Sequence, residues 1–497
     1  MLHIKNPVEK HFEKITRYHL YFYSLVFISQ LPNCWHLLSI IFLSPTVDFY
    51  CNSTDGSSIL KNKCPCNDPQ WDKRVFTKTV QTKFGIYCDK KWLISFSESM
   101  TNVGTLLGAS LFGMLSDKHG RLSMLSLSCF IVATSGCVVS IMPNIGSFIF
   151  MRCIEGLGAG GAMVTAYVLC IEYSGVNDRE TVSALFHIPV TFSHITLPAV
   201  SYFLRDCNQF QLAISIPLYA FVTLTWLLLE SPKWLMDNGR IDDAAMVMNK
   251  IAKFNKQPQS NIKAEIIEYN RTQNPASITK LNFFYIFKDK NLTTNFACMS
   301  WIYFVCGLGY YGVSEYISGM SKDIHRNVAI SGMLILPGTL AAVILLKRLY
   351  RRTFLMSTCF LSGIFMIVVI STDASSTWMR LIMACICNCF FFLSFIIVFL
   401  YGVELFPTSI RNSVLGILSL MSRLGQIAAP PVVKSLSEIT SGSVFGVTAI
   451  LGAVTCFPLP ETKGMELPSS LQHSKTLPRR KSMLEQSIMS AIGSKSS

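Results

Sequence analysis

Long stretches without charged residues alternate with short polar segments along this chain of 497 residues. Ten runs of at least eighteen residues contain no Asp, Glu, Lys or Arg: 18–47, 99–116, 122–151, 181–204, 207–229, 291–314, 327–346, 353–372, 381–403 and 439–460. Two apolar segments of similar length include charges, 146–171 and 412–433. Because a helix needs about 20 apolar residues to cross the hydrocarbon of a bilayer, the pattern predicts twelve membrane-spanning helices.

Composition agrees with a polytopic membrane protein and explains the charge. The chain is 51% hydrophobic and only 14% charged, whereas a soluble protein is about a quarter charged. Its 43 basic and 29 acidic residues give a net charge of +14. Basic residues are retained on the cytoplasmic side of a membrane, so this excess needs no nucleic-acid partner. We expect an integral membrane protein, in the plasma membrane, with both termini in the cytoplasm.

The loop between the first two spans, 44–93, is expected on the opposite, extracellular side. Asn52 begins an Asn-Ser-Thr glycosylation acceptor. The loop also contains an even number of cysteines, which predicts two disulfides. Their pairing cannot be deduced from the sequence. The four residues are Cys51, Cys64, Cys66 and Cys88.

Charged residues recur at a nearly constant offset of 231 or 232 positions, which indicates a duplicated six-span unit. Two such units of equal topology form a parallel repeat, and transporters built this way bind substrate between the halves. The matched positions are Glu172 with Glu404, Arg179 with Arg411, Arg121 with Arg352, and Glu230 with Glu461.

The repeat predicts five segments along the chain. They are a cytoplasmic N-terminus (1–17), a six-helix bundle (18–229), a cytoplasmic linker (230–290), a second six-helix bundle (291–460) and a cytoplasmic tail (461–497).

Two segments resemble signatures of the major facilitator superfamily: Gly113-Met-Leu-Ser-Asp-Lys-His-Gly-Arg121 and Arg152-Cys-Ile-Glu-Gly-Leu-Gly-Ala-Gly160. Further segments resemble the branch of organic cation, organic anion and carnitine transporters, solute carrier family 22. They are the cysteine-bearing loop, Glu230-Ser-Pro-Lys-Trp-Leu235, Tyr401-Gly-Val-Glu-Leu-Phe-Pro-Thr-Ser-Ile-Arg411 and Pro460-Glu-Thr-Lys-Gly464. The resemblance implies an all-α fold of twelve transmembrane helices in two parallel repeats. It also implies a secondary transporter that works by alternating access and is not an enzyme.

The signature residues are expected to form a charge network that holds the cytoplasmic face shut. Gly113 and Gly120 allow a close helix approach and a tight turn. The alternative is ordinary surface charge of little energetic value. The charged members of the proposed gate are Asp117, Arg121, Glu172, Arg179, Glu404 and Arg411. In the fourth span, Arg152, Glu155 and Gly156 are interpreted as structural, with the two charges pairing internally.

Arg423 is the candidate anchor for substrate. It lies about eleven residues into its span, where a charge is costly and therefore tends to face a cavity. An arginine there can bind a carboxylate through two hydrogen bonds; the alternative is an internal ion pair. The resemblance implies that cation carriers have acidic residues where this chain has Arg423 and Ile335, and that many anion carriers add a lysine where it has Thr339. One positive anchor favours a monocarboxylate or a zwitterion such as carnitine.

Four more residues are candidate substrate contacts. Tyr310 and Tyr311 resemble the paired tyrosines of anion carriers, although core packing is an equal alternative. Asn33 and His36 lie near Pro32, where we expect the first span to kink or unwind. They either line the cavity or form hydrogen bonds between helices.

Other classes of site are not expected. Gly156-x-Gly158-x-x-Gly161 fits a dinucleotide fingerprint, but it lies inside an apolar span, where small residues serve helix packing. No metal site and no cofactor are predicted. The expected partners are a small organic ion, the bilayer and a coupling ion or counter-substrate. The rival functions are an organic cation transporter and a non-transporting membrane receptor with the same fold.

Overall fold

The computed structural model describes most of the chain. The described residues are 7–12, 14–45, 47–52, 59–64, 66, 68–175, 178–257, 261–272, 283–320, 323–373, 375–406 and 408–463. They are mainly α-helical, as the hydrophobic pattern predicts, and they divide into two compact units. The first unit comprises 1–274, 314–337 and 427–437, and the second comprises 275–313, 338–426 and 438–497.

Helices cover every predicted span. The first half contains α2 (Arg17–Leu38) with α3 (Ile40–Leu43), α5 (Trp92–His119), α6 (Arg121–Ile141), α7 (Ile145–Glu172), α8 (Arg179–Leu185) with α9 (Ile188–Phe203), and α10 (Cys207–Leu224). The second half contains α14 (Lys290–Gly319), α15 (Ile324–Arg348), α16 (Arg351–Ser371), α17 (Thr377–Leu405), α18 (Thr408–Ser435) and α19 (Glu438–Thr455). Among the described helices, eight are long and apolar enough to cross a membrane by composition alone. The other predicted spans, α2, α5, α10 and α18, carry more polar residues.

The first span is interrupted later than expected. Helix α2 continues through Pro32 and Asn33 and ends at Leu38, and α3 begins at Ile40. Of the two predicted alternatives at Pro32, local unwinding was therefore wrong, and a kink stays a prediction. A proline removes one backbone hydrogen bond, and the surrounding helices can stabilise the helix despite that loss.

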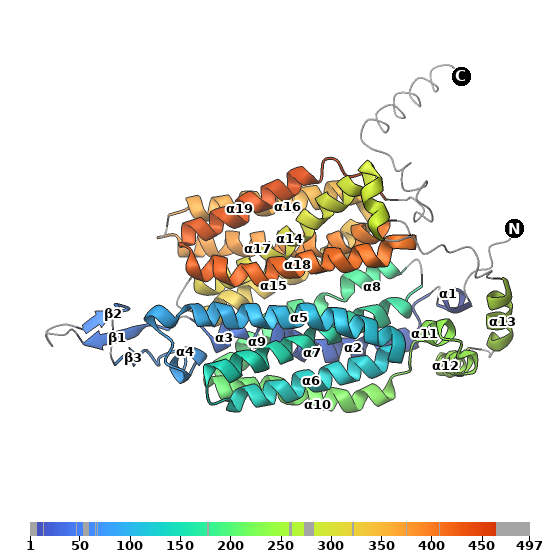
Figure 1. Ribbon diagram of the computed structural model, residues 1–497, viewed down its shortest axis with the longest axis horizontal. Helices are drawn as coiled ribbons and strands as arrows, with labels where there is room; N and C mark the ends of the chain where they lie inside the picture. Colours follow the sequence, from blue (N-terminus) through green and yellow to red (C-terminus); the bar gives the residue numbers. More distant parts are fainter. Residues whose placement is uncertain are drawn as a thin grey trace, which may run out of the picture. The chain divides into compact units, whose positions relative to one another are not determined.

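In the first unit, α7 packs between α5 and α6, while α10 packs on α6 and α2 (Figure 1). Glycines bring α5 and α7 into backbone contact. A Cβ added to Gly156 would lie 2.1 Å from the Thr101 carbonyl oxygen, and one added to Gly108 would lie 1.8 Å from that of Leu157. Gly158 instead faces α6, where an added Cβ would lie 2.8 Å from Val132. The glycines of the apparent dinucleotide motif thus lie at the contacts between three closely packed helices.

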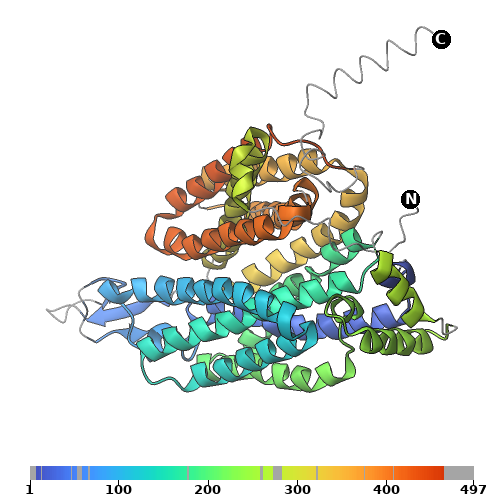
Figure 2. The same ribbon diagram turned by 45° about the vertical axis from the view of Figure 1, so that its right-hand side comes forward.

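The segment after α10 packs on the end of this bundle that is predicted to be cytoplasmic. It contains α11 (Pro232–Asp237), α12 (Ile241–Phe254) and α13 (Ile262–Thr272), which lie together at that end of the bundle (Figure 2). Their buried apolar side chains share a core with α2 and α7. Phe22 stacks on Tyr173 at 4.2 Å, and the Tyr173 hydroxyl donates to the Leu229 carbonyl at 3.0 Å. This shared core is why most of the predicted linker belongs to the first unit.

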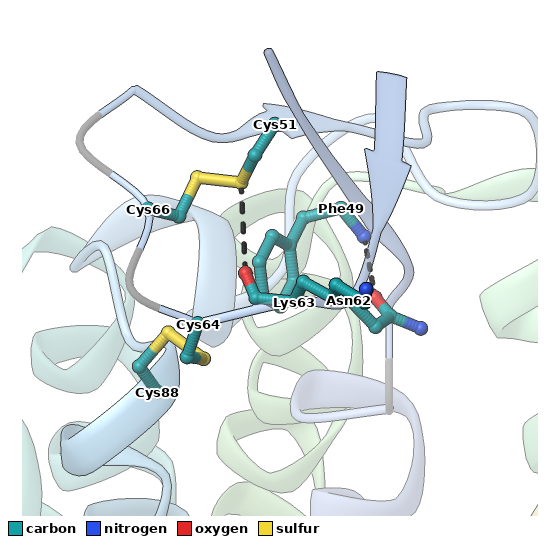
Figure 3. Close-up of a disulfide and its surroundings, with 7 residues drawn as sticks. All are labelled: Phe49, Cys51, Asn62, Lys63, Cys64, Cys66 and Cys88. Carbon is teal, nitrogen blue, oxygen red and sulfur yellow. Dashed lines mark hydrogen bonds between the residues drawn. A yellow bond between two sulfur atoms is a disulfide. The ribbon is translucent and has the colours of Figure 1, made fainter. Parts of the chain in front are cut away.

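The outer loop, on the side predicted to be extracellular, is a small folded element rather than an irregular segment. Strands β1 (Phe49–Asn52), β2 (Ile59–Lys61) and β3 (Gln70–Trp71) form an antiparallel sheet in the order β2-β1-β3. Disulfides join Cys51 to Cys66 and Cys64 to Cys88, which resolves the pairing that the sequence left open (Figure 3). The Asn62 side chain accepts from the Phe49 N–H at 2.9 Å and holds the turn into the sheet.

In the second unit, α16 packs against α17 and α19. Helices α14 and α18 also touch through backbone. A Cβ on Gly307 would lie 2.1 Å from the Ser422 carbonyl oxygen, and one on Gly425 would lie 2.3 Å from that of Phe304. The two helices therefore have no side chain between them at this level, one position before Arg423 and two positions after it.

Candidate functional site

A polar cluster lies inside the first unit, where the last turn of α2 meets the first halves of α7 and α10. Glu155 is its centre, because its Oε1 atom accepts from Arg152 Nη1 at 3.0 Å and from Gln211 Nε2 at 3.0 Å. The same oxygen contacts His36 Nδ1 in a short hydrogen bond. Arg152 Nη1 also donates to Ser39 Oγ at 3.0 Å, in the break between α2 and α3. We call these five residues the inner polar cluster.

The inner polar cluster is closed to solvent. Arg152 is 0% exposed, and both Glu155 and His36 are 1% exposed. The His36 ring packs beside Gly136 of α6, where an added Cβ would lie 2.7 Å from His36 Cε1. One arginine and one glutamate balance in charge, which lets ionised groups occupy an apolar bundle. The arrangement joins three helices and places the predicted internal pair of Arg152 with Glu155 at its core.

Asn33 lies one turn from His36 and is also buried. Its Nδ2 donates to Gln30 Oε1 at 3.2 Å and to the Ala159 carbonyl at 3.3 Å. Both Asn33 and His36 therefore make the helix-to-helix hydrogen bonds that were one of the two alternatives for them. A role in substrate contact stays a prediction for both.

A second group of charges lies where α5 meets α6, at the end of the first unit predicted to be cytoplasmic. Gly120 separates the two helices with φ of +105°, a conformation that favours glycine. Arg121, the first residue of α6, donates from Nη2 to Glu172 Oε1 at 3.0 Å and also pairs with the exposed Asp117. The Arg121 side chain is 11% exposed, so its pair with Glu172 is partly shielded from water.

Glu230 caps the start of α6. Its carboxylate accepts from the backbone N–H groups of Arg121 at 3.1 Å and Leu122 at 3.1 Å. A carboxylate at a helix N-terminus is stabilised by these donors and by the helix dipole. Burial nevertheless raises the pKa of Glu230, and the backbone N–H donors partly offset that effect.

The second unit repeats this arrangement at the start of α16. Glu461 accepts from the backbone N–H groups of Arg351 at 2.8 Å and Arg352 at 3.1 Å. Arg351 Nη2 lies 3.2 Å from Glu404 Oε1, as Arg121 does to Glu172. The repeat is therefore present, but the residue equivalent to Arg121 is Arg351 rather than Arg352. The offset between these two arginines is therefore 230. Arg121 and Arg351 are each the first residue of a capped helix, whereas Arg352, the last arginine of the basic run, is the second residue of its helix.

Other predicted members of the charge network are only partly described. Arg179 begins α8. Arg411 lies in α18, but its side chain is outside the described residues. Gly113 lies inside α5. A Cβ added to it would lie 3.9 Å from its nearest neighbour, Val164, so Gly113 does not bring two helix backbones into contact as Gly156 does. The side chain of Asn52, the predicted glycosylation site, is also outside the described part of the chain.

The predicted substrate anchor, Arg423, lies in the second unit beside the close contact of α14 with α18. Its Nη1 donates to Gln426 Oε1 at 2.9 Å, and its side chain is half-buried. Tyr310 and Tyr311 follow Leu308, whose backbone meets Gly425. Their rings are 5.1 Å apart and edge to face. The predicted arginine and tyrosines thus lie within one helical turn of the same crossing of α14 with α18.

The two tyrosines differ in their surroundings. Tyr310 is 2% exposed and its ring packs on Phe392 at 5.0 Å and Phe395 at 6.1 Å. Tyr311 is half-buried. Tyr311 is thus the more accessible of the pair, and its ring packs against that of Tyr310.

Some polar residues of these sites were not predicted from the sequence. Gln211 and Ser39 belong to the inner polar cluster, and Glu98, Glu315 and Lys434 meet near the helix ends that are predicted to be extracellular. Each of the five is a polar residue within or beside an apolar run. This position in the sequence is the signal by which they could have been identified. Among the described residues, no group of three or more His, Cys, Asp or Glu side chains is arranged to hold a metal ion.

Comparison with known proteins gives related sequences over most of the chain. A family model described as "Sugar (and other) transporter" matches residues 56–470. The chain is 27% identical over 417 residues to solute carrier family 22 member 3 of Rattus norvegicus, covering 83% of this chain and 74% of the relative. It is 26% identical over 440 residues to member 1 of Bos taurus (88% and 77%) and 28% identical over 435 residues to member 6 of Oryctolagus cuniculus (85% and 78%).

Solved structures share the fold. A partially occluded inward-open structure of the xylose transporter XylE from E. coli matches with a TM-score of 0.65 at 18% identity, over 90% of this chain and all of that chain. The proton:xylose symporter XylE bound to 6-bromo-6-deoxy-D-glucose matches with a TM-score of 0.60 at 18% identity, over 90% and 98%. The predicted major facilitator fold is thereby confirmed.

Proposed function

Because the chain belongs to the sugar (and other) transporter family and its relatives are members of solute carrier family 22, we propose that it carries small organic anions or zwitterions across the plasma membrane. The chain is a membrane transporter and not an enzyme. The proposal concerns its substrate class, which we infer to be monocarboxylates or zwitterions such as carnitine, moved by alternating access.

Arg423 is the observation that carries this proposal. Its guanidinium is permanently charged and carries five N–H donors, and its Nη1 donates to Gln426 Oε1. The guanidinium fork fits a carboxylate through two parallel hydrogen bonds. Its neighbours Ser422 and Gly425 are buried against α14, so the backbone that carries Arg423 is held firmly. A firmly held cation deep in a span is suited to bind an anionic group.

Tyr311 supports recognition of the rest of the substrate. Its half-buried ring offers an aromatic face and a hydroxyl at the level of Arg423. An aromatic face attracts a quaternary ammonium group and also stacks on an aromatic acid. A solute with a carboxylate and either of these groups would use both residues.

Replacing Arg423 with glutamine is expected to lower carboxylate uptake by roughly tenfold to a hundredfold, because a charge-assisted hydrogen bond contributes about 1.5–3 kcal/mol. The measurement is initial uptake of labelled carnitine, an aromatic monocarboxylate and tetraethylammonium into cells expressing the full chain. Arg423→Lys should retain part of the uptake, because it keeps the charge but loses the fork geometry.

Arg348→Gln is the matched control, since Arg348 is exposed at the end of α15. It should leave uptake unchanged. Carboxylate uptake that survives Arg423→Gln would remove Arg423 as the anchor. Uptake of tetraethylammonium alone would favour the organic cation transporter, and no uptake of any solute by protein at the cell surface would favour the receptor.

A further inference from the structure

Three charged side chains meet near the outer ends of their helices in the first unit. Lys434 Nζ, in the last turn of α18, lies 2.7 Å from Glu98 Oε2 of α5 and 2.7 Å from Glu315 Oε1 of α14. The outer segments of α14 and α18 belong to the first unit, together with α5. Ser99 Oγ also donates to the Ile427 carbonyl of α18 at 3.0 Å. We call Glu98, Glu315 and Lys434 the outer cluster.

The outer cluster has one carboxylate more than it has cations. The charged groups that act on Glu315 are Glu98 and Lys434, and those that act on Lys434 are the two glutamates. The Glu315 side chain is 9% exposed and that of Glu98 is 12% exposed. The Lys434 side chain is 26% exposed. With all three groups ionised, the cluster would carry a net charge of −1, with both carboxylates largely buried. An uncompensated buried charge costs several kcal/mol, and two carboxylates that share a site do not both ionise readily.

The two carboxylates are not equivalent. Lys434 Nζ donates a hydrogen bond to Glu98 Oε2. Glu315 Oε1 lies equally near to Nζ, and the Glu315 side chain is the more deeply buried of the two, at 9% against 12% exposed. Glu315 is therefore the carboxylate whose charge is less well compensated. The ammonium group already occupies the position between the carboxylates, so a proton fits the remaining need better than a metal ion does.

We propose that the outer cluster binds one proton, on Glu315, when the outer ends of α5, α14 and α18 come together, and releases it to the outer solution when they part. The carboxylate takes the proton from water on that side and becomes a neutral carboxyl group. When the helices part, both carboxylates are hydrated and ionise near their ordinary pKa of about 4. The inference rests on the proposed transport function and adds a regulation of it by pH.

The direction of the effect follows from proton linkage. The closed outer end binds one proton more than the open one, so its population rises as the outer pH falls. A difference of one proton changes the ratio of closed to open by up to tenfold per pH unit. Acidification outside would thus keep the outer end closed, and alkaline conditions would favour its opening.

A histidine of the same region must be distinguished from the outer cluster. His325, in the first turn of α15, stacks on Phe42 at 5.4 Å and on Phe76 at 5.2 Å, and its Nε2 lies 3.1 Å from Ser201 Oγ. Arg205 and Asp323 act on it electrostatically. Because a histidine titrates near neutral pH, His325 is the alternative source of any pH response.

The test is the distance between spin labels at Trp92 on α5 and Leu436 beside Lys434, introduced as encoded spin-label residues. Both positions are exposed, at 59% and 43%. Pulsed electron resonance on the full chain in lipid nanodiscs, without substrate, gives the populations of short and long distances. Between pH 7.5 and 5.5 the ratio of short to long should rise about tenfold or more.

The variants assign this response to its residues. Glu315→Gln should give a high short-distance population that no longer depends on pH, because the cluster is then neutral without a proton. His325→Gln and Asp323→Asn, the latter altering an exposed acid paired with Arg326, should keep the wild-type response. Since glutamine is nearly isosteric with glutamate, Glu315→Gln tests charge rather than folding.

Three results would overturn the proposal: distance populations that do not change with pH in the wild type, a response that His325→Gln removes, or a response to Na⁺ at constant pH. The test needs no substrate, so it is independent of the proposed function. A pH response without uptake of any solute would contradict transport of organic ions and leave the proton site standing. Uptake of organic ions without a pH response of the distances would support the proposed function and contradict the proton site.

Discussion

Glu155→Gln is expected to destabilise the protein by about 3–5 kcal/mol, because it leaves the Arg152 guanidinium buried without a counter-charge. Arg152 is 0% exposed, and among the described residues its hydrogen-bond partner besides Glu155 is the neutral Ser39 hydroxyl. Arg152→Gln should cost less, since the remaining Glu155 carboxylate keeps its contacts with His36 and Gln211. The double variant, in which neither charge remains, should be more stable than Glu155→Gln alone.

The measurement is the midpoint of thermal unfolding of purified protein in lipid nanodiscs, with the fraction of chain at the cell surface as a second readout. Arg240 and Asp243 provide the control pair, because they have the same spacing of three residues but are 55% and 42% exposed. Neutralising either of them should change stability by less than about 1 kcal/mol. A Glu155→Gln protein as stable as the wild type would show that Arg152 is not compensated by Glu155.

Gly156→Ala is the second change with a large expected effect. The added methyl group would lie 2.1 Å from the Thr101 carbonyl oxygen and 3.2 Å from the Thr105 backbone nitrogen, so α5 and α7 would have to separate. Backbone cannot change rotamer to make room, and overpacking of this kind costs about 1–3 kcal/mol or more. The unfolding midpoint should fall, and the surface-expressed fraction should fall with it.

Gly146→Ala, in the first turn of the same helix, is the matched control. Its added Cβ would meet only Asn144 Oδ1 at 3.6 Å, an ordinary contact. The higher helix propensity of alanine should make this variant neutral or more stable by less than about 1 kcal/mol. If Gly156→Ala behaved like Gly146→Ala, the close contact of α5 with α7 would be wrong.

The sequence predicts what depends on local pattern. The spans follow from runs of apolar residues, and the pairing of Arg152 with Glu155 follows from a spacing of three within one helix. The repeat was also visible, although its register was misassigned by one residue. The sequence comparison paired Arg121 with Arg352. In the structure the residue equivalent to Arg121 is Arg351, the first residue of the helix that Glu461 caps.

Contacts between distant segments could not be predicted in this way. His36 and Glu155 are 119 residues apart, and Glu98 and Lys434 are 336 apart. Nothing in the local sequence of either residue specifies its partner, because that choice depends on how the helices pack. The strands β1 to β3 were missed for a related reason: a strand of two to four residues is too short to show alternation.

The order of the four loop cysteines has a consequence for biosynthesis. The bonds interlace, since Cys64 lies between Cys51 and Cys66, and Cys66 lies between Cys64 and Cys88. Because Cys64 and Cys66 are two residues apart, an exchange of their partners requires only a small displacement of the chain. The register of Cys51 opposite Leu60 in the sheet favours the correct pairs. Maturation of this loop therefore calls for an oxidising compartment that also allows disulfides to reshuffle until the sheet has formed.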